Sequence, residues 1–198
     1  LDLLHEGFAK DPTQFIKKVF FEFQQSIRKT ERNKSRIYKS LARLGELKIT
    51  DDGPLEFVNI YRSVVSELFD PYISLIVAII QFKEGIFSSY VGANLGAQER
   101  NKVEFCLARL KPSHLFSGYN PVVRNAVTHP GTDGLRFEGN KIIFTNISRG
   151  VPPRSDTVTW TADELNHKIL QLMDFIHSAH IAVNIFGIDI SDMIREDK

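Results

Sequence analysis

Apolar residues recur at steps of three and four over most of the chain, which is the period of an amphipathic helix. The clearest run lies near the C-terminus. There Thr161-Ala-Asp-Glu164 has the pattern of a capping box, and Gly187 is a typical residue for a helix end. The apolar side of this helix is predicted to contain Leu165, Ile169, Leu172, Ile176, Ala179, Val183 and Phe186. The pattern therefore predicts a long final helix that begins at Thr161 and ends near Gly187.

Earlier parts of the chain show the same period. Apolar spacing predicts a helix from Asp11-Pro12 to about Leu47, then a turn, and then a helix from Leu55 to Phe69. Asp70-Pro71 is typical of a helix start, so a new or kinked helix is expected from there to about Phe82. Its apolar run is too short to span a bilayer and indicates burial. Gln98 to Leu110 is amphipathic again, with Val103, Leu107 and Leu110 on one side.

Between about residues 134 and 160 the period changes to that of strands. Leu135–Phe137 and Lys141–Thr145 flank Glu138-Gly139-Asn140, which suits a hairpin turn, and Asp156–Trp160 could add a third strand. The expected fold is mostly α: a helical bundle with a small β-hairpin insertion before the last helix.

Composition limits the classes of function. The chain has 198 residues, 42% of them hydrophobic, which suits one domain or a domain with a helical extension. Its net charge of +1 means that any nucleic-acid surface must be local. A single cysteine, Cys106, excludes a disulfide framework and suits a reducing compartment, so a cytoplasmic location without membrane insertion is expected.

One short segment carries candidate chemistry. Asn120-Pro121 suits the start of a helix, and Pro130 disfavours helical backbone at His129, so a short helix should carry Arg124 and Asn125 and end near His129. A fixed cation and a proton carrier together suit reaction at a phosphodiester. The plainer alternative is a histidine bonded to a helix carbonyl and an arginine in a surface ion pair.

A second arginine–histidine pair, Arg109 and His114, has similar spacing. Pro112 lies between the two residues and would break a helix there. The residue after Arg109 is also apolar. Arg124 and His129 are therefore the preferred candidates, and His114 serves as their control.

The motif Arg124-Asn125-(three residues)-His129, followed by one more long helix, resembles the R-x4–6-H motif of HEPN domains. The resemblance covers about Leu55 to Ile188. It implies a HEPN-like helical bundle over residues 51–198, with residues 1–50 as a basic helical extension. It also implies a homodimer in which two motif helices form one metal-independent site that cleaves RNA. In that site Arg124 and His129 would be catalytic, Asn125 would orient them, and no cofactor would be needed. HEPN domains are found in many RNA-cleaving toxins and antiviral effectors. The resemblance therefore implies RNA as the substrate and a cognate antitoxin or control domain as a further partner.

Basic residues recur every three or four positions in the N-terminal part of the chain, with little acid between them. They would share one face of a continuous helix and could contact the phosphates of RNA. The alternative is an ordinary solvated helix face. The basic positions are Arg28, Arg32, Arg36, Lys39 and Arg43.

Other candidate sites favour plain interpretations. His167, His177 and His180 lie on the final helix, but no further ligand has a metal-binding spacing, so no metal site is expected. Gly92–Gly96 lacks the lysine and hydroxyl residue of a phosphate loop and is interpreted as a connector.

Three functions follow from these features. The first is a metal-independent endoribonuclease of HEPN type, in which the basic extension holds RNA. The second is a non-catalytic dimeric binding or regulatory module of the same fold. The third is a nucleic-acid-binding helical protein that uses only the basic residues.

Overall fold

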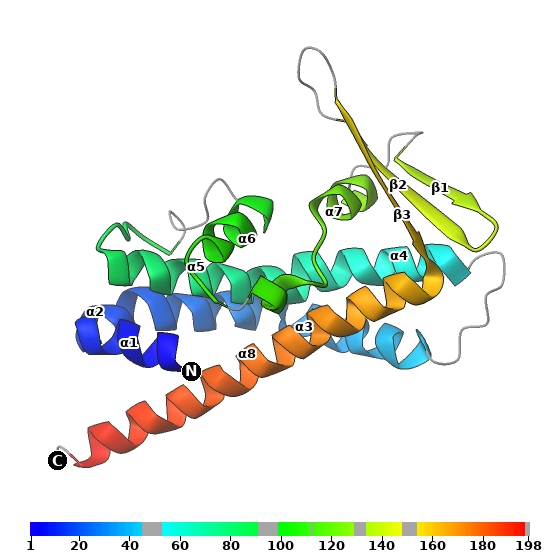
Figure 1. The fold of residues 1–198 in the computed structure, drawn as a ribbon. Coiled ribbons are helices and arrows are strands. Elements are labelled where there is room, and N and C mark those ends of the chain that lie inside the picture. The colour runs from blue at the N-terminus through cyan, green and yellow to red at the C-terminus, as the bar shows by residue number, and fades with distance from the viewer. Residues whose placement is uncertain (45–52, 91–98, 112, 129–133, 148–153, 197–198) are drawn as a thin grey trace. The chain divides into compact units, whose positions relative to one another are not determined.

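The computed structural model describes residues 1–44, 53–90, 99–111, 113–128, 134–147 and 154–196. The protein is mostly helical (76% helix) and has a small three-stranded antiparallel sheet before the last helix (Figure 1). The predicted mostly α class with a β insertion is thus confirmed.

The N-terminal part contains α1 (Asp2–Lys10), α2 (Pro12–Phe15), the π-helical turn η1 (Ile16–Phe20) and α3 (Phe21–Leu44). The predicted helix start is confirmed, because Asp11 Oδ1 accepts a hydrogen bond from Gln14 N at 2.9 Å. The prediction missed α1, which has no side-chain cap. Tertiary packing holds this helix, since a Cβ on Gly7 would lie only 2.5 Å from the Phe15 ring.

The next helical stretch consists of α4 (Gly53–Ser63), the π-helical turn η2 (Val64–Phe69) and α5 (Asp70–Glu84). A new α-helical segment begins at Asp70 with Pro71 in its first turn, as predicted, but Asp70 is not its cap, because Phe69 already has helical backbone angles. The wide turn immediately before Pro71 accommodates a residue that has no N–H to donate. The end near Phe82 is confirmed within two residues, with Gly85 in the left-handed region at φ 79°. Residues Pro71 to Ile80 are largely buried, as predicted.

The helix α6 (Glu99–Leu107) ends three residues before the predicted end at Leu110, and its buried side is only partly the predicted one, since Val103 is buried as expected. Lys102 is 2% exposed, whereas Leu107 is 41% exposed. Lys102 Nζ donates to Asp70 Oδ1 at 2.6 Å and to Ser74 Oγ at 2.9 Å, which links α6 to α5. The Lys102 ammonium can be buried because it has a carboxylate and a hydroxyl as partners, and its burial decides which side of α6 faces inward.

The sheet is built from β1 (Leu135–Glu138), β2 (Lys141–Ile147) and β3 (Ser155–Thr161), in that order. All three predicted strands are confirmed, and Gly139 makes the hairpin turn at φ 61°. Phe144 lies opposite Val158, and its ring packs edge-on against Trp160. One face of the sheet is therefore apolar. The short helix α7 (Pro121–Thr128) packs chiefly on β2 and also contacts β3.

The last helix, α8 (Ala162–Glu196), begins as predicted. Thr161 Oγ1 accepts from Glu164 N at 3.1 Å, and Glu164 Oε2 accepts from Thr161 N at 2.7 Å. Its predicted end at Gly187 is wrong, because α8 continues to Glu196. Contacts beyond the glycine favour helix: Ile190 is buried, and Asp189 bonds His5 of α1 at 2.9 Å. These contacts outweigh the modest helix cost of one glycine.

The chain divides into two compact units. Unit 1 comprises Leu1–Glu31, Phe69–Ser113 and Asp174–Lys198, and unit 2 comprises Arg32–Leu68 and His114–Met173. The helix α7 and the whole sheet belong to unit 2. The expected division into an extension and a bundle at residue 50 stays a prediction.

Two stretches among the described residues are long and apolar enough to cross a bilayer, Pro54–Glu84 and Ala162–Met193. In the first, 72% of the most apolar window is buried within the protein; in the second, the share is 33%. Core helices of soluble proteins meet the same criteria of length and composition. The cytoplasmic location therefore stays a prediction.

The buried pair of Lys102 and Asp70 generates a stability prediction. Lys102→Met should lower the free energy of unfolding by about 1–3 kcal/mol, since it removes the charged donor from a carboxylate that is 30% exposed. Adding Asp70→Asn should recover part of the loss. Urea denaturation monitored by circular dichroism measures both changes.

The matched control is Arg100→Met on the same helix. Arg100 pairs with Glu104 at 2.7 Å, but both side chains are more than half exposed. An exposed pair of this kind contributes less than about 1 kcal/mol. Equal losses for Lys102→Met and Arg100→Met would contradict a stabilising role for the buried pair.

Candidate functional site

The start of α7 is fixed by its own sequence. Asn120 Oδ1 accepts hydrogen bonds from Val122 N at 2.9 Å and Val123 N at 3.2 Å. Pro121 occupies the first helical position, where no N–H is required. Both features of the predicted helix start are therefore confirmed. The helix is described as far as Thr128, and the predicted end near His129 lies outside the described residues.

A buried tyrosine ties this helix start to α4. The Tyr61 hydroxyl donates to Gly118 O at 3.1 Å and accepts from Asn120 N at 3.0 Å. Burial raises the pKa of Tyr61 well above its ordinary value, against the lowering effect of the Asn120 N–H bond. The hydroxyl thus stays protonated and can both donate and accept. Sequence analysis missed Tyr61, because nothing in its local pattern distinguishes it from an ordinary core aromatic residue.

Arg124 and Asn125 lie together on α7. Arg124 Nη1 donates to Asn125 Oδ1 at 3.2 Å, and Thr128 Oγ1 donates to Arg124 O at 2.8 Å. Both Arg124 and Asn125 are half-buried. The amide therefore restrains one edge of the guanidinium. The third predicted member, His129, lies outside the described residues.

The opposite side of α7 anchors it to the sheet. Val123, Ala126 and Val127 are buried on the helix, and Ile142 and Phe144 are buried on β2. Burying several aliphatic and aromatic side chains stabilises this packing by an amount on the order of 1.5–3 kcal/mol for each large one. Arg124 and Asn125 thus project from a helix that is fixed both at its start and along one face.

The predicted basic residues lie on α3, which is continuous from Phe21 to Leu44. Arg28, Arg36, Lys39 and Arg43 are exposed, and the side chain of Arg32 lies outside the described part of the chain. Arg36 Nη2 lies 3.5 Å from Glu67 Oε1, and the Arg36 side chain remains 70% exposed. Such an exposed pair contributes little to stability, so Arg36 can still contact a polyanion.

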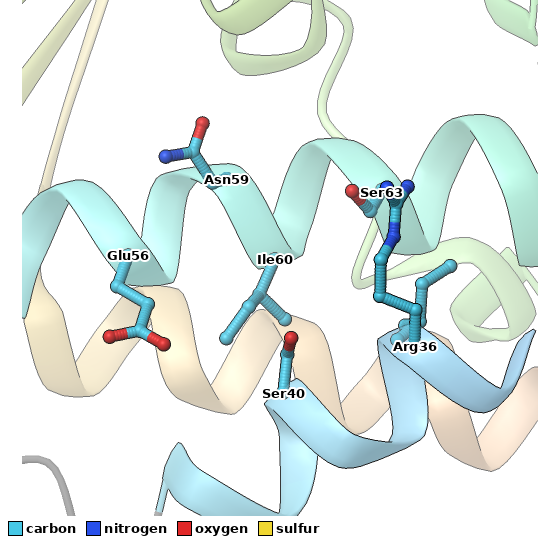
Figure 2. Close-up of a pocket in the computed structure, with 7 residues that line it drawn as sticks. Arg36, Ser40, Glu56, Asn59, Ile60 and Ser63 are labelled. Carbon is cyan, nitrogen blue, oxygen red and sulfur yellow. The ribbon is translucent and has the colours of Figure 1, made fainter. Parts of the chain in front are cut away.

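A groove of about 240 Å³ runs between α3 and α4 beside Arg36. Figure 2 shows Glu56 at one end and Arg36, beside Ser63, at the other, with Ser40 and Ile60 between them. The remaining lining residues are Ile37 and Asn59. Sequence analysis missed this groove, since its residues come from two helices and share no motif. It offers both a cation and a carboxylate to a polar ligand.

Neither member of the control pair lies on a long helix. The helix α6 ends at Leu107, and His114 lies exposed in the 3-10 turn η4 (Ser113–Phe116). Arg109 Nε donates to Glu84 Oε1 at 2.8 Å, and its guanidinium lies over the Phe105 ring. Arg109 is thus held by Glu84 and Phe105, which belong to the same unit.

The other candidate side chains have ordinary contacts. His180 Nδ1 lies 2.9 Å from the Tyr72 hydroxyl, and His167 Nε2 lies 3.2 Å from Gln171 Nε2. Among the residues that the structure describes, no group of three or more potential ligands could hold a metal ion. Burial raises the pKa of the Cys106 thiol to about 12, although Arg109 lowers it slightly. The connector predicted at Gly92–Gly96 lies outside the described residues.

Comparison with known proteins finds no matching family model, no matching curated protein and no matching solved structure. The candidate site must therefore be argued from its own residues.

The anchoring of α7 predicts the effect of removing one oxygen atom. Tyr61→Phe keeps the ring but leaves Gly118 O and Asn120 N without this partner, so stability should fall by about 1–2 kcal/mol. Amide hydrogen exchange should accelerate at the start of α7. Urea denaturation and exchange mass spectrometry measure the two effects.

Tyr90→Phe provides the control. The Tyr90 hydroxyl is also buried, but its bond to Pro71 O is 3.5 Å long, at the limit for a hydrogen bond. A smaller loss of stability is expected, with no change in exchange at α7. Unchanged exchange in Tyr61→Phe as well would remove the proposed anchoring role.

Proposed function

We propose that the protein is a metal-independent endoribonuclease that acts as a homodimer. The observation that carries the proposal is the half-buried Arg124–Asn125 pair on a short, capped helix. In the sequence His129 directly follows Thr128. The same elements resemble the R-x4–6-H motif of HEPN domains. A HEPN-like bundle over residues 51–198 is part of this proposal.

The side chains suit cleavage of an RNA phosphodiester. Neutral His129 would take the proton from a ribose 2′-hydroxyl, and the 2′ oxygen would attack phosphorus. The bond from phosphorus to the 5′ oxygen would break, and a protonated second His129 would donate a proton to the leaving oxygen. Arg124 would stabilise the charge on the phosphate oxygens. The products are a 2′,3′-cyclic phosphate and a free 5′-hydroxyl.

The geometry of one helix supports a site completed by a second chain. Residues five positions apart on an ideal helix point about 140° away from each other. Arg124 and His129 of one chain would therefore aim poorly at the same phosphate if His129 continued the helix. Two copies could supply Arg124 from one helix and His129 from the other.

RNA binding is assigned to the basic face of α3. Arg36, Lys39 and Arg43 are exposed at helical spacing within unit 2, and Arg28 is exposed on the same helix. Phosphate contacts of this kind give affinity that does not depend on sequence. The groove beside Arg36 could receive a polar group of the same RNA.

The wider setting is proposed from the resemblance alone. A ribonuclease of this type suits a toxin or antiviral effector in a cytoplasm, held in check by an antitoxin or control domain.

A non-catalytic dimeric module is the second candidate. It is favoured by the contact of Arg124 with its neighbour Asn125, which is also what a structural arginine would make. The third candidate, a nucleic-acid-binding protein that uses only α3, is favoured by the exposure of Arg36 and Arg43.

The main prediction concerns chemistry. His129→Ala should lower the rate of RNA cleavage by about 10²–10⁴-fold, since positioned proton transfer typically contributes that much. Arg124→Ala should be comparably inactive, and Arg124→Lys should recover only part of the rate because lysine lacks the planar donor fork. Cleavage should persist in EDTA. The rate should pass through a maximum and fall at both lower and higher pH, because one His129 must be neutral to act as the base and the other must be protonated to act as the acid.

His114→Ala is the matched control and should cleave RNA at the wild-type rate. Inhibition by EDTA, or an inactive His114→Ala beside an active His129→Ala, would show that the site is wrongly assigned. If the wild-type protein cleaves no RNA, the non-catalytic module becomes the better proposal.

A separate prediction concerns binding. Arg36→Glu with Arg43→Glu should weaken RNA binding and flatten its salt dependence, because each lost phosphate contact lowers the slope of log affinity against log salt by about 0.7 for single strands. Fluorescence anisotropy over a salt series measures both quantities.

Lys17→Glu with Lys18→Glu makes the same change in charge at two exposed positions outside the basic face. It should leave the slope closer to that of the wild type. Equal salt slopes for the wild type and both double variants would mean that the basic face is an ordinary solvated surface that does not bind RNA.

A further inference from the structure

The strand β3 forms an edge of the sheet. The strand order is β1-β2-β3, and among the described residues β2 is the strand that pairs with β3. Ser155, Asp156, Thr157 and Thr159 are exposed. The strand contains no proline and no lysine, the residues that commonly protect a sheet edge. An edge of this length and composition can pair with another strand.

The hydrogen-bond pattern shows which backbone groups face outward. Thr145 N donates to Gly134 O at 2.9 Å, so Thr145 turns toward the β1 side. Since antiparallel strands alternate, Phe144 turns toward β3 and bonds its partner Val158. Thr157 and Thr159 must then present their N–H and C=O groups away from β2. These groups form the outer edge of β3.

We propose that β3 pairs antiparallel with β3 of a second copy, about a two-fold axis at Val158, and so forms a six-stranded sheet. This inference rests on the proposed homodimer and names its interface. About four backbone hydrogen bonds would join Thr157 of each copy to Thr159 of the partner subunit.

The ends of the strand select this register. Pro152-Pro153 precede β3 in the sequence, and α8 begins at Ala162. The paired segment is therefore limited to Ser155–Thr161, and a symmetric antiparallel pair that uses all of it must be centred on Val158. In this register threonine faces threonine, which is a favourable cross-strand pair.

The charges agree with pairing to an identical strand. Asp156 carries the single formal charge of β3, and in the proposed register it faces Trp160 of the partner subunit. No like charges would therefore lie directly opposite each other. The other edge is a poorer candidate, since β1 has four residues, of which Arg136 and Glu138 are charged. These features favour a second copy as the occupant.

The pairing would bring the two motif helices together. A two-fold axis between symmetric antiparallel strands is perpendicular to the sheet, so it keeps both copies of α7 on the same face. Since α7 packs on β2 and β3, the two helices would lie on either side of the axis. With strands about 4.8 Å apart, β2 and its symmetry mate are about 14 Å apart. Arg124 and Asn125 of both copies would then border one shared space.

Substitution with proline tests the edge. Thr159→Pro removes an outward N–H and leaves the β2–β3 ladder intact, since proline is tolerated where the N–H faces solvent. It should shift the protein from dimer to monomer in light scattering at micromolar concentration. Phe137→Pro is the matched control, because Phe137 faces outward on the opposite edge, and it should remain dimeric.

A disulfide tests the register. Val158 would face Val158 of the partner subunit as a non-hydrogen-bonded pair, with Cα atoms about 4.5 Å apart, which a disulfide can bridge. Val158→Cys should therefore form a covalent dimer under mild oxidation. Thr157→Cys should crosslink poorly, because its symmetry mate is a diagonal neighbour about 7–8 Å away. The native Cys106 is buried and should not interfere.

The outcomes separate this inference from the proposed function. A dimer that persists in Thr159→Pro and does not crosslink through Val158→Cys would overturn the β3 interface while leaving a ribonuclease dimer possible. A strictly monomeric wild-type protein would overturn the interface and the composite site together. Larger assemblies that crosslink through both Val158→Cys and Thr157→Cys would indicate unspecific edge pairing and would also overturn the proposal. RNA cleavage by the wild-type protein, measured separately, decides the proposed function.

Discussion

The placement of the candidate site depends on one buried hydroxyl group. Tyr61 projects from α4 and holds both the carbonyl of Gly118 and the amide of Asn120. These two groups belong to the segment that leads into α7. A helix of eight residues is too short to be stable by itself in water. Its direction must therefore come from contacts, and Tyr61 supplies the contact at its start while the sheet supplies the contact along its length.

A second constraint acts on the same segment. A Cβ on Gly118 would lie 2.6 Å from Lys168 O of α8, so only glycine allows this close approach. Lys168 Nζ also donates to Ser117 O at 3.0 Å. The segment before α7 is thus held by α4 on one side and by the first turns of α8 on the other. Both contacts lie within unit 2, the unit that contains the candidate site.

Local signals in the sequence predicted local structure well. The capping box at Thr161, the cap at Asn120 and the turn at Gly139 each satisfy backbone groups within a few residues, so their meaning does not depend on distant parts of the chain. The failures occurred where distant contacts decide the structure. Gly187 does not end α8 because residues after it find partners in α1, and Lys102 is buried because α5 supplies Asp70 and Ser74.

The same distinction applies to the site. Arg124 and Asn125 are neighbours in the sequence, and the cap at Asn120 was enough to predict that both lie on a short helix. Tyr61 and the groove beside Arg36 come from elements that are far apart in the sequence, and no spacing indicates them.

The open edge of β3 and the half-buried Arg124–Asn125 pair on α7 belong to the same small sheet and its covering helix. The sheet of three strands buries one face against α7 and leaves β3 able to accept a partner. Pairing at that edge would leave the packing of α7 on β2 unchanged, because the new bonds use groups that face away from β2. The pairing would place two Arg124–Asn125 pairs, one from each copy, on the same face of the joined sheet. In the proposed assembly through β3, each chain would keep its own fold while the candidate side chains would come from two copies.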